Sequence, residues 1–218
     1  SKCIVVFGIN MDNSKVTVGA KINKAIEEGR MTQVIVVDPK RIPLANKGIH
    51  IKIRPGTDTA LCLGMLNVII SEGLEDKEFV EKYCLGFDKL AEHVKQYPPE
   101  KVSEITWVPA EDIRKIARIF ATTKPASIVP GTCSIDQHIN GFQNNRALAI
   151  LHAITGNYAG FAQAAIEKAH PGVTAMFMIQ CGADQNPNPR SKLEYAQKHG
   201  ETLAAEVSRV MAGKLEPV

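Results

Sequence analysis

Residues 33–41 read QVIVVDPKR, and this stretch decides the predicted fold. Its first five residues are an apolar, mostly β-branched run, which is typical of a strand buried on both faces. A similar run, CIVVFGIN, occupies residues 3–10, and residues 15–28 between the two have the apolar spacing of a helix. Strand, helix and strand this close together form a βαβ unit, which requires parallel strands and a right-handed crossover.

Further elements continue this alternation. A third strand is expected at residues 49–53, followed by a helix at 59–71 that is apolar nearly all round and therefore buried. The remaining expected elements are amphipathic helices at 76–84, at 87–96 and from 109 onward, a strand at 126–129 and a helix at 142–154. The predicted fold class is α/β: a doubly wound, mostly parallel, Rossmann-like sheet with helices on both faces, over residues 1–157.

The pattern changes near residues 155–160, so a second segment is expected at residues 158–218. It is predicted to contain a helix at 161–169, a strand at 174–179 and a last helix that begins at Ser191 in a capping box with Glu194. The prediction therefore adds a C-terminal α-β-α segment to the sheet domain.

The composition narrows the choice of partners and of compartment. A net charge of +3 with dispersed basic residues argues against nucleic acid, and no apolar stretch is long enough to span a membrane. No signal peptide opens the sequence, so a cytoplasmic location is expected. The sequence begins almost at once with a strand, as though a longer protein preceded it, and an export signal in that missing part is the open alternative.

The five cysteines, at positions 3, 62, 84, 133 and 181, are widely spaced and include no C-x-x-C pair. That spacing argues against a disulfide framework and against a zinc or iron–sulfur cluster. We therefore expect reduced core thiols and no metal ligands among them.

Polar loops follow three successive strands, at the ends where ligands bind in open α/β sheets. Glycine permits close backbone approach, amides donate and accept, carboxylates bind ribose or a base edge, and guanidinium groups or helix N-termini bind phosphate. The candidate binding residues are Gly8 and Asn10 in the first loop, Asp38 and Arg41 in the second, and Arg54, Gly56, Thr57 and Asp58 in the third. Together the loops predict a nucleotide-type ligand on the sheet.

Each loop also has a structural explanation. Asp38 can cap a turn before proline, Thr57 and Asp58 can start the next helix, and the G-x-G-x-x-G fingerprint is absent. In the loop of residues 131–141, Gln137 and His138 are the best-placed candidates for contact with a ligand. Neither H-E-x-x-H nor a nucleophile elbow occurs, so no catalytic residue is assigned.

Five separated segments resemble the molybdopterin oxidoreductase family, which includes formate dehydrogenases and nitrate and polysulfide reductases. The segments are residues 36–41, 53–61, 76–87, 109–114 and 137–147. Residues 63–67, 79–86 and 102–106 are most similar to the tungsten-dependent acetylene hydratase branch. The resemblance covers residues 1–157.

The resemblance implies that the candidate residues, including Gln137 and His138, line the site of one molybdopterin guanine dinucleotide with molybdenum or tungsten. The family's cysteine-rich iron–sulfur domain, the residue beside the metal and the large C-terminal portion have no counterpart in these 218 residues. We therefore expect a fragment that is not catalytic alone, that lacks the cofactor by itself, and whose partners are the remaining domains of the parent enzyme.

Residues 161–218, above all 175–190, resemble instead the neutral ceramidase superfamily of zinc amidohydrolases. Asn186-Pro187-Asn188 stands where that family places its serine before Pro-Asn, which argues against hydrolysis. Three alternatives stay open: a guanine-nucleotide-binding α/β domain without metal, an amidohydrolase, and a non-functional chimera of two fragments.

Overall fold

The computed structural model describes residues 1–157 together with residues 198, 201–202, 205 and 208–209. The chain divides into two units, Ser1–Tyr158 and Ala159–Val218, of which the first is described below. The helices expected at 161–169 and from Ser191, and the strand expected at 174–179, lie outside the described residues. Among the described helices, none has the length and apolar character needed to cross a membrane.

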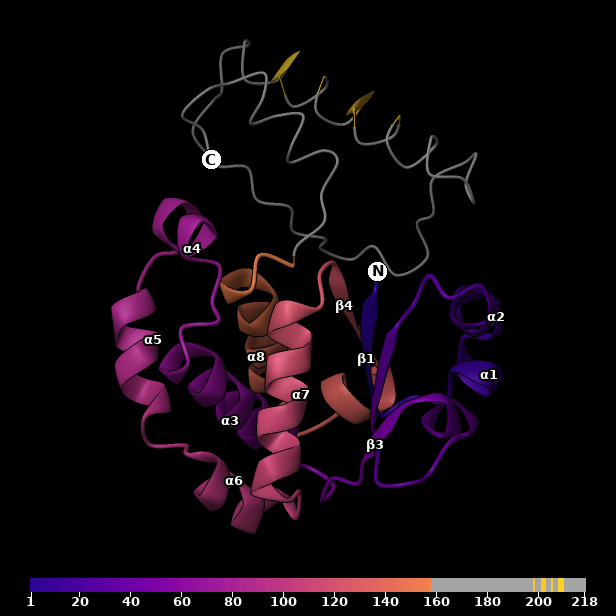
Figure 1. The fold of residues 1–218 in the computed structure, drawn as a ribbon, viewed down its shortest axis with the longest axis horizontal. Helices are drawn as coiled ribbons and strands as arrows, with labels where there is room; N and C mark the ends of the chain where they lie inside the picture. Colours follow the sequence, from indigo (N-terminus) through magenta and orange to yellow (C-terminus); the bar gives the residue numbers. More distant parts are fainter. Residues whose placement is uncertain (158–197, 199–200, 203–204, 206–207, 210–218) are drawn as a thin grey trace. The chain divides into compact units, whose positions relative to one another are not determined.

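A four-stranded parallel sheet forms the centre of the first unit (Figure 1). The strands are β1 (Cys3–Phe7), β2 (Gln33–Val37), β3 (Ile49–Ile51) and β4 (Ala126–Pro130). Their order is β3-β2-β1-β4, so β1 is paired on both edges, with β2 and with β4. The β1–β4 boundary is where the chain reverses its direction of travel across the sheet, the position at which doubly wound folds bind ligands.

Helices cover both faces of the sheet, which confirms the predicted fold class. One face carries α1 (Met11–Ser14), α2 (Val16–Glu27) and the short 3₁₀ helix η1 (Pro43–Lys47); the other carries α3 (Asp58–Ser71), α6 (Pro99–Thr106), α7 (Ala110–Thr122) and α8 (Gly141–Ile154). The helices α4 (Lys77–Tyr83) and α5 (Phe87–Val94) pack outside this second layer. Alternation along β1 divides the core, since Val5 faces the α3 side and Val6 the α2 side.

The helix α3 lies in the middle of the larger layer and contacts α5, α6, α7 and α8. Its even distribution of apolar residues fits this position, because a helix with neighbours all round has no solvent face. Gly64 of α3 allows close approach of α6: a Cβ atom added there would lie 3.0 Å from Val102 Cγ1. Burial of α3 therefore fixes the position of its first residue, Asp58, at the sheet edge.

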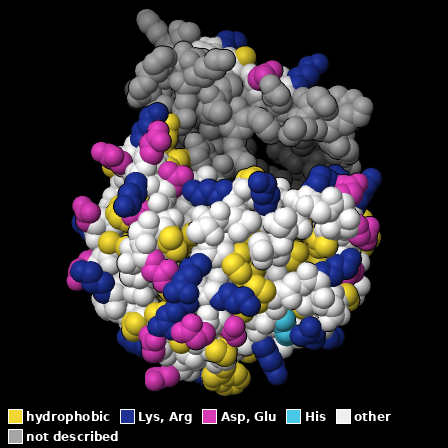
Figure 2. Space-filling view, in the orientation of Figure 1, with side chains coloured by type: hydrophobic (Ala, Val, Ile, Leu, Met, Phe, Trp, Pro, Cys, Tyr) yellow, Lys and Arg dark blue, Asp and Glu magenta, His cyan; other side chains and the backbone are white. Residues whose placement is uncertain are grey.

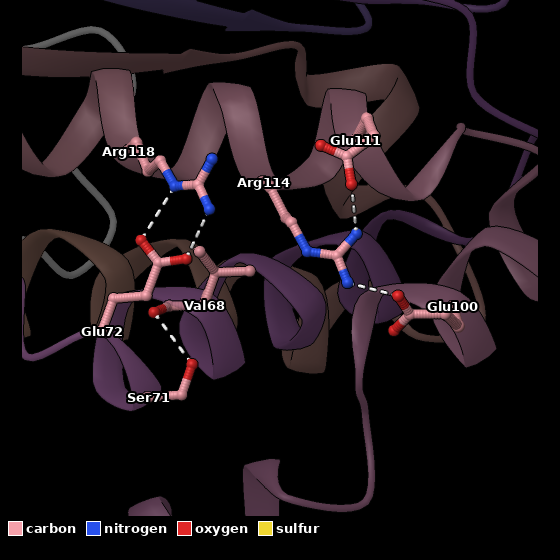
Figure 3. A network of polar contacts seen from close by, with 7 residues as sticks. All are labelled: Val68, Ser71, Glu72, Glu100, Glu111, Arg114 and Arg118. Carbon is pink, nitrogen blue, oxygen red and sulfur yellow. Dashed lines mark hydrogen bonds and ion pairs between the residues drawn. The ribbon is translucent and has the colours of Figure 1, made fainter.

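Charged pairs on the outer surface connect α7 to its neighbours (Figure 3). Arg118 donates two hydrogen bonds of 2.8 Å to the two carboxylate oxygens of Glu72, which follows α3. Arg114 pairs with Glu111 of its own helix and with Glu100 of α6. The hydrogen bond from Arg118 lowers the pKa of Glu72. On the face that Figure 2 shows, basic and acidic side chains are interspersed.

The cysteines correct one expectation. Cys3 and Cys62 are buried thiols, and burial raises the pKa of Cys3 to about 12. Cys84 is half-buried and Cys133 is exposed, so the expectation of core thiols is wrong for Cys133. Cys133 is an exposed residue of the loop after β4, whereas Ile135 of the same loop is buried in the core. Cys181 lies outside the described residues.

Short elements account for most of the other differences from the predicted pattern. Four short elements were not predicted from the sequence, namely α1, α6, η1 and the single π-helical turn η2 (Thr132–Asp136). Also, β3 ends at Ile51 rather than at residue 53. The chain leaves the sheet there, and the next segment is bound by α6 instead: Arg54 N–H donates to the carbonyl of Thr106 at 2.8 Å.

Candidate functional site

The loops that follow β1 and β4 are fixed to the sheet by backbone hydrogen bonds. Gly8 N–H donates to the Val37 carbonyl and Gly131 N–H donates to the Phe7 carbonyl, each at 2.8 Å. Because all four strands are parallel, their carboxyl ends lie along one edge. The predicted candidate residues lie in the loops after β1, β2 and β3, and Gln137 and His138 lie in the loop after β4. All four loops start from this edge.

Gly8 has a φ of +57° and lies directly against the loop after β4. A Cβ atom added at Gly8 would collide with Ser134 Oγ, which donates a hydrogen bond of 3.0 Å to the Gly131 carbonyl. Ser134 therefore fills the space that a side chain at position 8 would need. Ser134 was not predicted from the sequence, because no local pattern connects it to a loop so far away in the chain.

Asn10 provides an acceptor at the same edge. It precedes α1, but its side chain makes no capping hydrogen bond. Its Oδ1 atom is buried and has no hydrogen-bond partner within the described part of the chain. A buried carbonyl oxygen without a partner is uncommon in folded proteins, since desolvation is then uncompensated. The described residues therefore leave this acceptor without a donor.

Asp38 and Asp58 place two buried carboxylates at the strand ends, each with 8% of its surface exposed. Asp38 Oδ1 accepts a hydrogen bond of 2.7 Å from Lys40 N–H, so Asp38 does cap the turn before Lys40. Burial raises the pKa of Asp58, the Asp38 charge adds to this, and the Asp58 backbone N–H and the charge of His138 oppose it. The three side chains therefore lie within electrostatic range of one another.

His138 lies against the third loop, although the two are far apart in the sequence. A Cβ atom added at Gly56, where φ is +82°, would lie 2.8 Å from His138 Nε2. The Nδ1 atom of His138 accepts a hydrogen bond of 3.2 Å from Asn140 N–H, which orients the ring. Gln137 is exposed, and its backbone N–H donates to the Thr132 carbonyl at 3.2 Å to close the π-helical turn.

The two candidate arginines lie in different surroundings. Arg41 is exposed, and its Nε donates to Asn46 Oδ1 of η1 at 2.9 Å. Arg54 lies over the ring of Trp107, with 5.2 Å between Cζ and the ring centroid. Thr57 fixes the start of the same loop, since its hydroxyl donates to the Arg54 carbonyl at 2.7 Å.

A cavity of about 380 Å³ opens beside the third loop. Its lining comprises Pro39, His50, Ile51, Lys52, Ile53, Pro55, Trp107, Val108, Pro109 and Asp112. It therefore joins the segments after β2 and β3 to the loop between α6 and α7. Trp107 was not among the sequence candidates, because nothing near it in the sequence suggests a ligand.

Asn144 of α8 connects two segments of the site through hydrogen bonds, and it was not among the residues predicted from the sequence. It is 1% exposed, accepts a hydrogen bond of 2.6 Å from the Thr59 hydroxyl and donates one of 3.1 Å to the Ile135 carbonyl. These bonds connect the first turn of α3 to the loop that holds His138. Among the described residues, no group of three or more His, Cys, Asp or Glu side chains could hold a metal ion.

Comparison with known proteins gives consistent matches. A family model described as molybdopterin oxidoreductase matches residues 1–211. Acetylene hydratase of Syntrophotalea acetylenica is 44% identical over 165 residues, which are 75% of this chain and 22% of that protein. The F420-dependent formate dehydrogenase subunit alpha of Methanocaldococcus jannaschii is 38% identical over 156 residues, 71% of this chain and 23% of that protein.

The solved structure of acetylene hydratase from Pelobacter acetylenicus matches with a TM-score of 0.69 and 44% identity, covering 73% of this chain and 22% of that one. The chain thus spans between a fifth and a quarter of the length of these relatives. The family match includes most of residues 158–218, for which the resemblance to ceramidases stays a prediction.

Proposed function

Because the chain belongs to the molybdopterin oxidoreductase family, we propose that its strand-end site binds the guanine nucleotide end of a molybdopterin guanine dinucleotide. The observation that carries the proposal is the pair of buried carboxylates, Asp38 and Asp58, at the carboxyl edge of a parallel sheet. The site is proposed to serve a longer enzyme, because the matched relatives are more than four times as long as the matched segment.

The donor and acceptor pattern of guanine fits these residues. The guanine edge presents adjacent N–H donors, and a carboxylate accepts two parallel hydrogen bonds. The carboxylate of Asp58 is desolvated, which raises its pKa, so donors from a bound base would compensate for its burial. The partnerless Oδ1 of Asn10 supplies one more acceptor for a ribose hydroxyl or a base amine.

The phosphates have partners in the third loop. Arg54 carries a charge that no acid in the described residues neutralises through an ion pair. The helix α3 begins at Asp58, and the N–H groups at a helix N-terminus attract an anion.

We assign binding and orientation, rather than catalysis, to the residues of this chain. In the complete enzyme the bound molybdenum or tungsten supplies the redox or hydration chemistry. The role proposed for the described residues is to hold the nucleotide end at one place, so that the distant pterin end is positioned.

Calorimetry tests the proposal. The full chain should bind GDP and the extracted pterin dinucleotide, and should bind ADP more weakly. Asp58→Ala should weaken GDP binding by about 1–3 kcal/mol, because hydrogen bonds to a charged group are lost. Glu78→Ala, at an exposed position on α4, is the control and should leave binding unchanged.

The outcomes separate the alternatives. No preference for GDP over ADP, or unchanged binding by Asp58→Ala, would contradict the guanine assignment. Equal affinity for GDP and the pterin dinucleotide would instead favour a guanine-nucleotide-binding domain that makes no contact with the pterin.

A further inference from the structure

Among the cations of the candidate site, only Arg54 lies over an aromatic ring, that of Trp107. The Trp107 ring lies 5.2 Å from Arg54 Cζ, and no ion pair involves Arg54 within residues 1–157. Arg41, by contrast, donates to the amide oxygen of Asn46. A guanidinium stacked on an indole interacts through its face, while its N–H groups lie in the plane and stay free to donate.

Backbone hydrogen bonds hold Arg54 and Trp107 next to each other. Arg54 N–H donates to the carbonyl of Thr106, the residue before Trp107, at 2.8 Å. Thr106 is fully buried, and its hydroxyl donates to the Val102 carbonyl at 2.8 Å. The Arg54 carbonyl is fixed in turn by the Thr57 hydroxyl. The pairing of Arg54 with Trp107 is therefore imposed by the fold on both sides.

Trp107 has a backbone conformation that stability does not explain. Its φ is +62°, the one positive value among the non-glycine residues that the structure describes. It ends α6 in the left-handed conformation at which helices prefer glycine. The residue is 67% exposed, so burial of the ring does not compensate for the strain. Trp107 also lines the cavity beside the third loop, and an exposed, strained aromatic residue in that position favours a role in binding.

We propose that Trp107 is a positioning residue that holds Arg54 as a receptor for a phosphate of the bound nucleotide. The ring limits the orientations of the guanidinium, and the cavity beside it is lined by Trp107 itself and by Pro55, the residue after Arg54. Two in-plane donors match two oxygens of a phosphate. The inference rests on the proposed nucleotide site and adds the group that recognises its phosphates.

A first experiment needs no ligand, because Trp107 is the single tryptophan of the chain. Iodide quenching of its fluorescence should fall in Arg54→Ala, since the adjacent cation no longer attracts the anion, whereas acrylamide quenching should not fall. Lys52→Ala removes another cation from the same cavity lining and is the control, with a smaller expected change. An unchanged iodide response in Arg54→Ala would overturn the stacking.

A second experiment measures what the stack does for binding. By calorimetry, Trp107→Gly should weaken GDP and pyrophosphate binding about threefold to tenfold, as for loss of a cation–π contact that orients a charged donor. Guanosine, which has no phosphate, should bind equally well, and Trp107→Phe should restore most of the GDP affinity. The same Trp107→Gly protein should melt at a higher temperature, because glycine relieves the left-handed strain.

The outcomes distinguish this inference from the proposed function. Equal weakening of guanosine and GDP, or no weakening, would overturn the role of Trp107. Pyrophosphate binding that depends on Trp107, without any guanosine binding, would support the phosphate receptor and contradict the guanine site. If wild-type protein binds neither pyrophosphate nor GDP, the inference is overturned.

Discussion

Gly56 and His138 touch across the candidate site: a Cβ atom added at Gly56 would lie 2.8 Å from His138 Nε2. Gly56→Ala should therefore cause both left-handed strain and a clash with the imidazole. We expect the free energy of unfolding to fall by about 1–3 kcal/mol, measured by urea denaturation.

Gly86→Ala is the matched control for this prediction. Its φ of +79° is close to that of Gly56, but a Cβ atom there has nothing within 4 Å. In a His138→Ala background the cost of Gly56→Ala should drop to that of Gly86→Ala. Equal costs of Gly56→Ala in both backgrounds would show that the imidazole is not the cause.

The buried carboxylate of Asp58 should make stability depend on pH. Burial raises its pKa above that in the unfolded chain, so its ionised form destabilises the fold. The stability that the Asp58 carboxyl contributes is fully present at pH values below the ordinary carboxyl pKa. It is lost as the pH rises through the raised pKa of Asp58 in the folded protein. Asp58→Asn should therefore be more stable than wild type at pH 7 and equal to it near the acid limit. A less stable Asp58→Asn protein at pH 7 would contradict the prediction.

The start of α4 depends on Asp76. Its carboxylate accepts a hydrogen bond of 3.1 Å from Phe79 N–H and pairs with Lys124 at 2.9 Å. Asp76→Ala should lower the free energy of unfolding by about 1–2 kcal/mol through loss of the N-cap. Asp76→Asn retains a capping oxygen and should lose less. Identical losses in the two variants would assign the effect to the charge rather than to the cap.

The Glu72–Arg118 pair should also respond to pH, in the opposite direction to Asp58. The hydrogen bond from Arg118 lowers the pKa of Glu72, so its stabilisation is present above the ordinary carboxyl pKa and is lost as pH falls through the lowered value. Glu72→Gln should be slightly less stable than wild type at pH 7, because the pair is partly exposed. Thermal melts should converge at acid pH, and a constant difference would exclude the ion pair as the cause.

The strands and long helices were predictable because their signals are local. The β-branched runs at β1 and β2 admit a single interpretation, and the apolar surface of α3 requires neighbours on every side. Shorter elements such as α6 were missed, although Pro99 in its first turn and the buried pair Val102 and Thr106 one turn apart are helix signals. Besides the proline, α6 has only two apolar residues, Val102 and Ile105, whereas the equally short α5 has apolar residues at 87, 90, 91 and 94 and was predicted.

The candidate site was predictable only as far as topology dictates. Parallel strands necessarily bring their following loops to one edge, so Asp38 and Asp58 could be placed near each other without coordinates. The orientation of Arg41 towards Asn46 could not be predicted in this way, because it depends on the local course of η1. The contacts of Ser134 with Gly8 and of Trp107 with Arg54 join remote segments and leave no trace in either local sequence.

The double pairing of β1 has a consequence for synthesis on the ribosome. Its partner on one edge is β2, which follows within a single crossover, whereas its partner on the other edge, β4, is translated more than a hundred residues later. At about 5–20 residues per second that interval is on the order of ten seconds. Throughout it, a strand of five buried apolar residues presents an unpaired edge, the geometry that recruits other chains. We therefore expect a nascent chain that stalls before residue 126 to bind chaperones or to aggregate.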